Sequence, residues 1–309
     1  MANDGSAFGA SLPAWRTRFS LGDFGFLALI LLVFVGLKPF ALRDAEALLH
    51  GADETGVGNL ARQLSYLAVF AVIGFAAARE NGWRIIRAVP VSMLLLLAWC
   101  VASVAWTAEP YVTLRRAALE LIVVAAIFMS VESLGPSRSL EWMRWLLAGV
   151  LIVNWIAIAF VPQAIHLTGE ADPALVGNWR GLYFHKNIAG AVSAISALVF
   201  FFSFLDTRRW WDAALFAGAA VFTVMTHSKT SIALLPAAIA AGIVFRFAWR
   251  RALDRQIALV AFALGAFVVV VAMISEWNTI TSLLAEPGEL TGRAEIWRAW
   301  SFVFPRRPA

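Results

Sequence analysis

The sequence has few charged residues and a single cysteine, and both shortages narrow the classes of protein to which it can belong. Asp, Glu, Lys and Arg make up 15% of the 309 residues, whereas a soluble domain carries about a quarter. The lone cysteine, Cys100, lies in an apolar run, so no disulfide framework and no cysteine metal cluster can form. The sequence also lacks a Walker loop, a His-x-x-x-His zinc pair and a Gly-x-Ser-x-Gly elbow. No ATP-driven or zinc chemistry is indicated, and we expect no cofactor and no metal.

Apolar residues are what the sequence has in excess. They make up 61% of the chain, and the mean hydropathy is +0.76. A membrane-spanning helix needs about 20 mostly apolar residues, and no strand-like alternation is visible. We therefore expect an all-α polytopic membrane protein with one domain over 1–309. Its nine predicted spans are 24–42, 60–78, 90–106, 112–131, 143–162, 188–205, 211–226, 230–248 and 256–275.

The basic residues between these runs predict the orientation of the chain. With a cytoplasmic N-terminus, the inside segments carry 13 basic and 8 acidic residues, and the outside segments carry 12 of each. Short cytoplasmic loops are enriched in Lys and Arg. We therefore predict a cytoplasmic tail over 1–23, a nine-span bundle over 24–275 and an outer segment over 276–309. The net charge of +5 then reflects membrane orientation, so we expect no nucleic-acid partner.

One stretch, 179–190, gathers polar residues directly before an apolar run: Trp-Arg-Gly-Leu-Tyr-Phe-His-Lys-Asn-Ile-Ala-Gly. It places four polar residues directly before the run 188–205: Arg180, His185, Lys186 and Asn187. Asn187 is a natural N-cap, and a helix beginning there points its partial positive charge and its unpaired N–H groups at these residues. The stretch predicts a site for an anion, most simply a phosphate or diphosphate. The alternative is a loop whose basic residues only anchor a helix at the lipid headgroups.

Two further cationic segments lie on the same predicted outer side. Lys229 belongs to the turn 226–231 between the seventh and eighth runs, where Ser228 or Thr230 can cap the next helix. Arg293 belongs to the segment 290–297 after the ninth run. Three cationic helix starts on one face favour a convergent polar site over three independent anchors.

Four short motifs follow one another between residues 106 and 297. The His-Lys-Asn-x-x-Gly and Gly-Arg-x-x-x-Trp pieces are the most specific. In their order and spacing the motifs resemble the O-antigen ligase and polymerase superfamily, especially its exopolysaccharide-polymerase branch. The motifs are Trp106-Thr107-Ala108-Glu109-Pro110 followed by Thr113-Leu114-Arg115-Arg116, then Arg180 to Gly190, then Ser228-Lys229-Thr230-Ser231, and last Thr291-Gly292-Arg293-Ala294-Glu295-Ile296-Trp297.

The resemblance implies metal-independent, inverting glycan transfer by a bundle of the glycosyltransferase-C type. The implied donor is a glycan on undecaprenyl diphosphate at the periplasmic face of the bacterial inner membrane. The implied acceptor is another lipid-linked repeat, for a polymerase, or a lipid A core, for a ligase. Arg180 and Arg293 match the family's outer-face arginines. His185, Lys186 and Asn187 match its loop-to-helix motif, and Lys229 is a weaker match.

One feature of the family is missing from the sequence. In the family, Gly-Arg-x-x-x-Trp opens a large outer loop that later carries a His-Asn motif, but this sequence ends 12 residues after Trp297. No residue matches the expected catalytic His, so we expect a truncated member without transfer activity unless His185 or His227 substitutes. Two other classes stay open: a transporter or flippase for a lipid-linked anion, and an inert accessory bundle.

Overall fold

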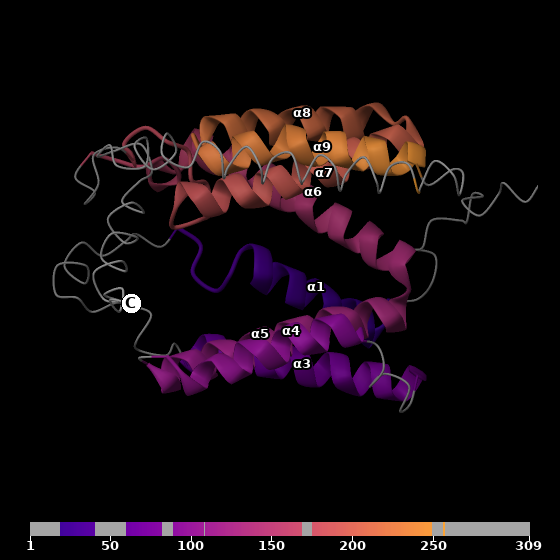
Figure 1. Ribbon diagram of the computed structural model, residues 1–309. Helices are drawn as coiled ribbons and strands as arrows, with labels where there is room; N and C mark the ends of the chain where they lie inside the picture. Colours follow the sequence, from indigo (N-terminus) through magenta and orange to yellow (C-terminus); the bar gives the residue numbers. More distant parts are fainter. Residues whose placement is uncertain are drawn as a thin grey trace, which may run out of the picture. The chain divides into compact units, whose positions relative to one another are not determined.

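The computed structural model describes residues 19–40, 60–81, 89–107, 109–168, 175–248 and 256. The chain divides into two compact units, Met1–Ala237 and Ala238–Ala309, and the packing reported below lies within the first. Among the described residues every regular element is a helix, and the single β-bridge pairs Ile165 with Trp179. In chain order (Figure 1) the helices are α1 (Leu21–Phe34), α3 (Leu60–Asn81), α4 (Val91–Ala102), η3 (Ser103–Ala105), α5 (Pro110–Leu134), α6 (Pro136–Phe160), η4 (Pro162–Ala164), α7 (Lys186–Thr207), α8 (Trp210–Met225) and α9 (Lys229–Ala248).

Most of the described helices are long and apolar enough to cross a membrane. Five of them meet this condition (α3, α5, α6, α7 and α9), and α1, α4 and α8 are shorter apolar helices. The described residues are thus all-helical as predicted, and five helices of this length and composition are consistent with a multi-pass membrane protein. The described helices follow the first eight predicted runs in order. The ninth run, 256–275, lies outside the described residues except for residue 256, so nine spans and a glycosyltransferase-C-like bundle stay predictions.

The first helix is shorter than the run 24–42 predicts. α1 begins with a capping box in which the Ser20 hydroxyl accepts the Asp23 N–H and the Asp23 carboxylate accepts the Ser20 N–H. It ends at Phe34 because Gly36 takes a left-handed conformation, with φ of 79°, and donates its N–H back to the Leu31 carbonyl.

The fifth predicted span, 143–162, is wrong in its start. α6 begins at Pro136, seven residues earlier. Gly135 has φ of 81° and separates α5 from α6, and Pro136 is suited to the first helical position. The polar residues that follow Pro136 continue the helix beyond its apolar part, so hydropathy alone places the boundary too late.

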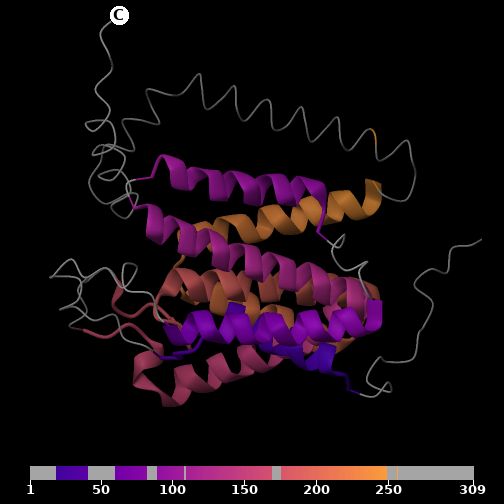
Figure 2. The same ribbon diagram turned by 90° about the horizontal axis from the view of Figure 1, so that it is seen from below.

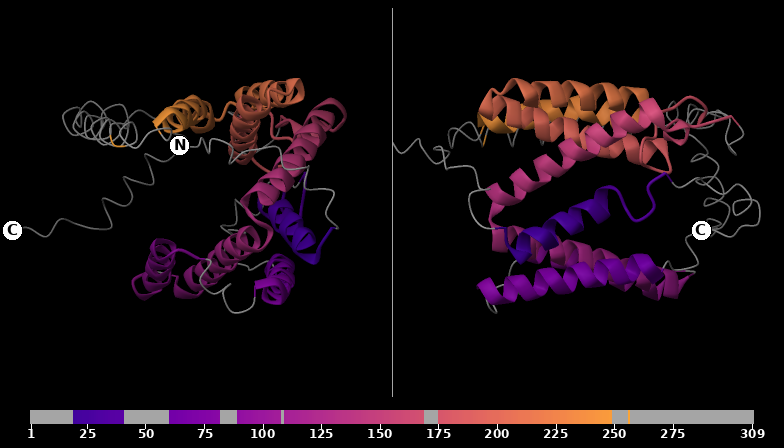
Figure 3. Two further views of the ribbon diagram at one scale, coloured as in Figure 1. Left: turned by 90° about the vertical axis from the view of Figure 1, so that its right-hand side faces the viewer. Right: turned by 180° about the vertical axis from the view of Figure 1, so that it is seen from behind.

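α1 is central to the first half of the bundle because it packs against α3, α5 and α6. The left panel of Figure 3 shows it between α6 and α3, and Figure 2 shows α5 between α3 and α4. The core of this group contains buried Leu29, Tyr66, Ile73 and Ala126. Gly25 allows α1 to approach α3 closely, since a Cβ at this position would lie 2.7 Å from Ile73 Cγ1.

α7 packs along α8 through small and hydroxyl-bearing residues. Ala197 on α7 and Ala219 on α8 are fully buried. The Thr223 hydroxyl of α8 donates to the Ser193 hydroxyl of α7 at 2.9 Å. Small residues let two membrane helices approach, and a hydroxyl hydrogen bond joins them in an apolar setting.

The helices turn at two ends of this unit. The long-loop end holds residues 161–168, residues 175–185 and the turn 226–228. The Phe40 N–H donates to the Leu182 carbonyl, which brings the chain after α1 to the same end. The short-turn end holds Ser20, Gly135 and the turn 208–209.

At the short-turn end a buried carboxylate joins α1 to α6. Asp23 is fully buried, and it accepts hydrogen bonds from Ser20, from Arg138 Nη2 at 2.5 Å and from Trp142 Nε1 at 2.8 Å. Burial alone would raise the pKa of Asp23, but these hydrogen bonds and the Arg138 charge hold this pKa below its ordinary value. The carboxylate therefore stays ionised and fixes the start of α1 against α6.

Candidate anion-binding site at the long-loop end

The loop between α6 and α7 folds back on itself as a short hairpin. Ile165 and Trp179 form its bridge. The His166 N–H donates to the Asn178 carbonyl at 3.0 Å. The N–H groups of Arg180 and Gly181 both donate to the Ala164 carbonyl, at 2.9 and 2.8 Å. This pairing provides backbone partners for the described part of the loop and leads the chain into position for α7.

Asn154, two turns before the end of α6, fixes the tip of the hairpin. Its Oδ1 accepts the Leu182 N–H at 2.9 Å, and its Nδ2 donates to the Val150 carbonyl at 2.9 Å. Gly181 has φ of 57°, and a Cβ there would lie 1.9 Å from Asn154 Oδ1. The positive φ and the close approach of Asn154 both favour glycine at this position.

Aromatic packing ties the hairpin to α8. The Trp179 ring forms edge-on contacts with Trp155 of α6 and Phe222 of α8, at centroid distances of 5.3 and 5.5 Å. The Trp179 N–H also donates to the Met225 carbonyl at the end of α8. The loop therefore lies directly beside the turn that leads from α8 to α9.

Arg180 is fully buried inside this loop. Its Nε donates to the Gln163 carbonyl at 2.5 Å, and its Nη1 donates to the Phe184 carbonyl at 3.4 Å. The side chain therefore joins the start of the loop to its end. The role of Arg180 as a diphosphate ligand stays a prediction, and in this structure its guanidinium is enclosed and contacts two carbonyls of its own loop.

Tyr183 is a second buried polar residue of the loop. Burial raises the pKa of the Tyr183 hydroxyl to about 12, and the Asn154 side chain beside it opposes this rise only in part. The phenol therefore stays neutral over the physiological range, and it contributes volume and polarity to the loop interior but no charge.

The start of α7 differs from the prediction. The N-cap residue is His185, not Asn187: its Nδ1 accepts the Asn187 N–H at 3.1 Å. His166 Nε2 accepts the Lys186 N–H at 3.3 Å, and the His185 carbonyl accepts the next two N–H groups. The expectation of unpaired N–H groups at this helix start is therefore wrong, because two imidazoles and the His185 carbonyl accept all four of them. An anion here would meet side-chain charge and the helix dipole.

The turn from α8 to α9 packs against Gly190, the fifth residue of α7. A Cβ at Gly190 would lie 2.6 Å from Ser228 Cβ and 2.9 Å from Thr226 Oγ1. The buried Ser228 hydroxyl is 3.0 Å from the Ser231 hydroxyl, and α9 begins at Lys229. Two of the three predicted cationic segments are thus brought together, each with a lysine as the first residue of a helix.

The predicted site residues differ in how they are placed. Lys186 and His185 are half-buried, Asn187 and Lys229 are exposed, and Arg180 is enclosed. Arg293 lies outside the described residues. Sequence reasoning missed His166 and Asn154. The one available signal was Asn154, which is a polar amide inside the apolar run 143–162.

The charge at this end comes from lysine and from helix dipoles. α7 and α9 both begin here, and a helix start carries about half a positive charge. Among the described residues no group of three His, Cys, Asp or Glu side chains could hold a metal ion. Lys186 and Lys229 at two helix starts suit a phosphate-type anion.

Comparison with known proteins yields no relative for this chain. No family model, no curated protein and no solved structure matches it.

Proposed function

We propose that this chain binds an undecaprenyl-diphosphate-linked glycan at the long-loop end and takes part in its polymerisation or ligation at the periplasmic face of the bacterial inner membrane. The observation that carries the proposal is the packing of the Lys186 helix start against the turn that precedes Lys229. Two lysines and two helix dipoles on one patch suit a diphosphate, which carries its charge on several oxygens. The motif resemblance supplies the glycan and the lipid carrier.

In the proposed reaction an acceptor hydroxyl attacks the anomeric carbon of the donor sugar. The new glycosidic C–O bond forms as the bond to the diphosphate breaks, with inversion at that carbon. The diphosphate leaves with the electron pair, and Lys186 and Lys229 stabilise the charge that develops on it. The hydroxyl proton passes to a base, so the site needs a side chain with an available lone pair near these lysines.

The tautomers of the two histidines beside the lysines differ, and this difference ranks them as bases. His185 accepts a hydrogen bond at Nδ1, so its neutral ring carries the proton on Nε2 and offers no further lone pair. His227 Nδ1 lies 3.1 Å from the Met225 carbonyl. A carbonyl only accepts, so this nitrogen carries the proton and the Nε2 lone pair of the exposed ring is available. His227 is therefore the better base of the two.

A transporter or flippase for a lipid-linked anion is the second candidate, because it could use the same cationic helix starts. Such proteins hold substrate near the bilayer midplane on interrupted helices. Lys186 and Lys229 are instead the first residues of α7 and α9, which favours a substrate site at the membrane surface. An inactive family member is the third candidate.

Binding is the first test, because it does not depend on transfer activity. The purified 309-residue chain is titrated with undecaprenyl diphosphate in EDTA, alongside undecaprenyl phosphate and undecaprenol. Lys186→Ala and Lys229→Ala should each weaken diphosphate binding about tenfold, since a charge-assisted contact is worth roughly 1.5–3 kcal/mol. Arg79→Ala is the matched control, because Arg79 is an exposed cation in the last turn of α3. Equal affinity in all three variants would rule out the site.

A second assay separates the enzyme from the transporter. The chain is placed in liposomes with lipid-linked repeat units, and both polymer length and transbilayer movement of unextended lipid are measured. Polymer that is lost in His227→Ala but kept in His185→Asn, which retains a capping residue, supports transfer with His227 as base. Movement of unextended lipid without polymer identifies a transporter.

A further inference from the structure

Two histidine side chains from different segments close the start of α7. The Lys186 N–H donates to Nε2 of His166, which belongs to the hairpin, at 3.3 Å. The Asn187 N–H donates to Nδ1 of His185 at 3.1 Å. The two rings are neighbours, with centroids 5.9 Å apart. His166 is only 2% exposed and His185 is half-buried, so the hairpin and the helix start meet at these two imidazoles.

Each of these contacts requires a neutral ring. A backbone N–H only donates, so the imidazole nitrogen that receives it must carry a lone pair. A neutral imidazole has one accepting and one donating nitrogen, whereas a protonated imidazole has two donating nitrogens. A proton on His166 Nε2 or on His185 Nδ1 would therefore place two donors against each other. Protonation of either ring is incompatible with the contact that the ring makes.

Histidine is the side chain that ordinarily changes its charge between pH 5 and pH 8. Among the described residues, the other titratable groups on the elements that meet at this end are Lys38 after α1, Arg180 and Tyr183 in the loop, Lys186 of α7, and His227 and Lys229 at the turn into α9. Lysine and arginine ordinarily keep their charge over this range. His227 differs from the other two histidines, because its Nδ1 contacts the Met225 carbonyl, which accepts a proton donor from a neutral or a protonated ring.

We propose that His166 and His185 form a proton-sensitive latch between the loop and α7, which is closed when both rings are neutral and opens when a ring is protonated. Opening separates the Lys186 and Asn187 N–H groups from their imidazole acceptors and releases the first turn of α7 from the hairpin. The lysine at the start of α7 then loses its fixed position. The latch rests on the two backbone contacts and does not depend on the proposed glycan chemistry.

The latch should be closed at pH 7.5 and weakened at pH 5.5. The open form binds more protons than the closed form, so the equilibrium moves toward the open form as the pH falls. A released histidine titrates near pH 6.5. One such ring therefore favours opening by about tenfold at pH 5.5, and two rings favour it by up to about a hundredfold.

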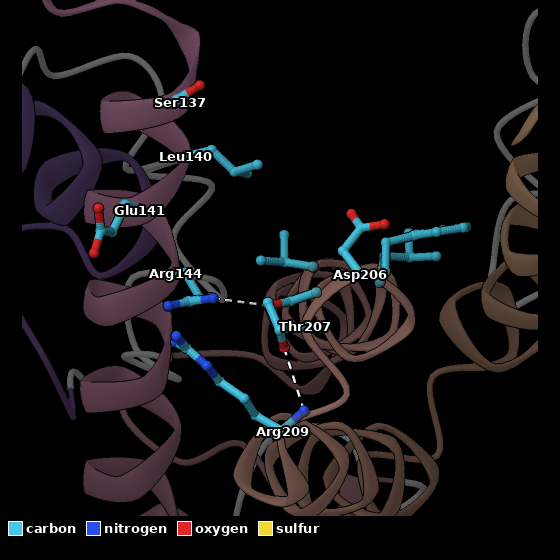
Figure 4. Close-up of a pocket in the computed structure, with 11 residues that line it drawn as sticks. Ser137, Leu140, Glu141, Arg144, Asp206, Thr207 and Arg209 are labelled. Carbon is cyan, nitrogen blue, oxygen red and sulfur yellow. Dashed lines mark hydrogen bonds between the residues drawn. The ribbon is translucent and has the colours of Figure 1, made fainter. Parts of the chain in front are cut away.

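The opposite end of α7 supplies an internal reference, because the contacts described there involve no histidine. Arg144 Nη1 of α6 donates to the Ser203 hydroxyl at 2.9 Å, and the Thr207 hydroxyl donates to buried Asp212 of α8 at 2.8 Å. A cavity of about 530 Å³ lies beside these contacts, between α6, α7 and the turn 208–209 (Figure 4). We expect this end of α7 to be unaffected over the same pH range.

Amide hydrogen exchange of the full chain in detergent tests the latch. Exchange of the peptides that cover 185–190 and 203–209 is measured at pH 7.5 and pH 5.5, and each rate is divided by the intrinsic rate at that pH. The corrected rate for 185–190 should rise about ten- to a hundredfold at pH 5.5, and that for 203–209 should stay constant. The double variant His166→Gln, His185→Asn keeps a side-chain oxygen as acceptor at both places and cannot take up the proton, so it should lose the response.

His227→Asn is the matched control and should respond to acid as the unmodified chain does. Each single variant, His166→Gln or His185→Asn, should keep a response of about tenfold, which tests the latch even if the double variant is unstable. The corrected rates of the variants at pH 7.5 show whether the latch is still closed in them. Equal corrected rates for 185–190 at the two pH values in the unmodified chain, or a full acid response in the closed double variant, would overturn the proposal.

Discussion

The side-chain oxygen of Asn154 lies where a Cβ at position 181 would be placed, since a Cβ built on Gly181 would be 1.9 Å from Asn154 Oδ1. The same oxygen accepts the Leu182 N–H. The contact connects the end of α6 to the tip of the hairpin, and the hairpin leads directly to Lys186. The position of Lys186 thus depends on the Asn154 amide inside an apolar helix.

Gly181→Ala is therefore expected to destabilise the chain strongly. The left-handed conformation costs about 1–2 kcal/mol for a non-glycine residue, and forcing a methyl group into a filled space adds about 1–3 kcal/mol. Gly177→Ala is the control, because Gly177 also has a positive φ, of 83°, but has no atom within 4 Å of its Cβ position. Thermal unfolding in detergent compares the two, and an equal loss in both would mean that the Asn154 contact has no effect on stability.

Arg180→Lys tests whether Arg180 holds the loop or binds the ligand directly. One ammonium cannot join the Gln163 and Phe184 carbonyls as the guanidinium does. We expect the melting temperature and the affinity for undecaprenyl diphosphate to fall together, with a loss of about 1–3 kcal/mol in stability. Loss of binding at an unchanged melting temperature would instead show that Arg180 contacts the diphosphate. Arg79→Lys should change neither quantity.

Tyr183 should make the chain sensitive to alkali. An unfolded tyrosine ionises near pH 10, whereas burial raises the pKa of Tyr183 to about 12. The folded state therefore resists ionisation, and the stability contributed by the buried phenol is complete below pH 10 and is lost as the pH rises toward 12.

The free energy of unfolding should therefore fall less in Tyr183→Phe than in the unmodified chain as the pH rises from 9 to 11. The difference should be about 1–2 kcal/mol, since one pKa unit corresponds to about 1.4 kcal/mol. Thermal unfolding across this range measures the difference. Tyr111→Phe, at a tyrosine that is 88% exposed, should follow the unmodified chain. Parallel pH profiles for Tyr183→Phe and the unmodified chain would contradict the expected ionisation behaviour.

The order of the helices could be predicted from the sequence because hydropathy reports burial in lipid or protein directly. It could also be predicted that the segments 186–190 and 226–231 lie at the same end, because successive spans alternate in direction. The enclosure of Arg180 could not be predicted, because a cation before a helix has the same sequence pattern whether its guanidinium contacts solvent or two carbonyls of its own loop.

The cap of α7 shows a similar limit. Asn is the better N-cap by propensity, but the hairpin places His166 against the Lys186 N–H, and His185 then caps the helix. That choice depends on a partner 20 residues away in the chain, which local sequence does not reveal. Asn154 is a comparable case, since its side-chain oxygen accepts a hydrogen bond from the Leu182 N–H of the following loop.

The predicted orientation places the long-loop end outside the cell. In a Cys100→Ala background, single cysteines replace Val176 in the loop and Arg208 in the turn between α7 and α8, both exposed. A membrane-impermeant thiol reagent applied to intact cells should label position 176 and not position 208. Labelling of position 208 alone would reverse the orientation and remove the periplasmic site.

The most direct test of the proposed function maps where a polyprenyl diphosphate touches the chain. A polyprenyl diphosphate with a photoreactive group on its first isoprene unit is cross-linked to the membrane-embedded protein, and the modified peptides are identified by mass spectrometry. Cross-links in the peptides that contain Lys186 and Lys229 are predicted, suppressed by undecaprenyl diphosphate and not by undecaprenol. Cross-links confined to the cavity near Arg144, or spread over the helix surfaces without competition, would contradict a diphosphate site at the long-loop end.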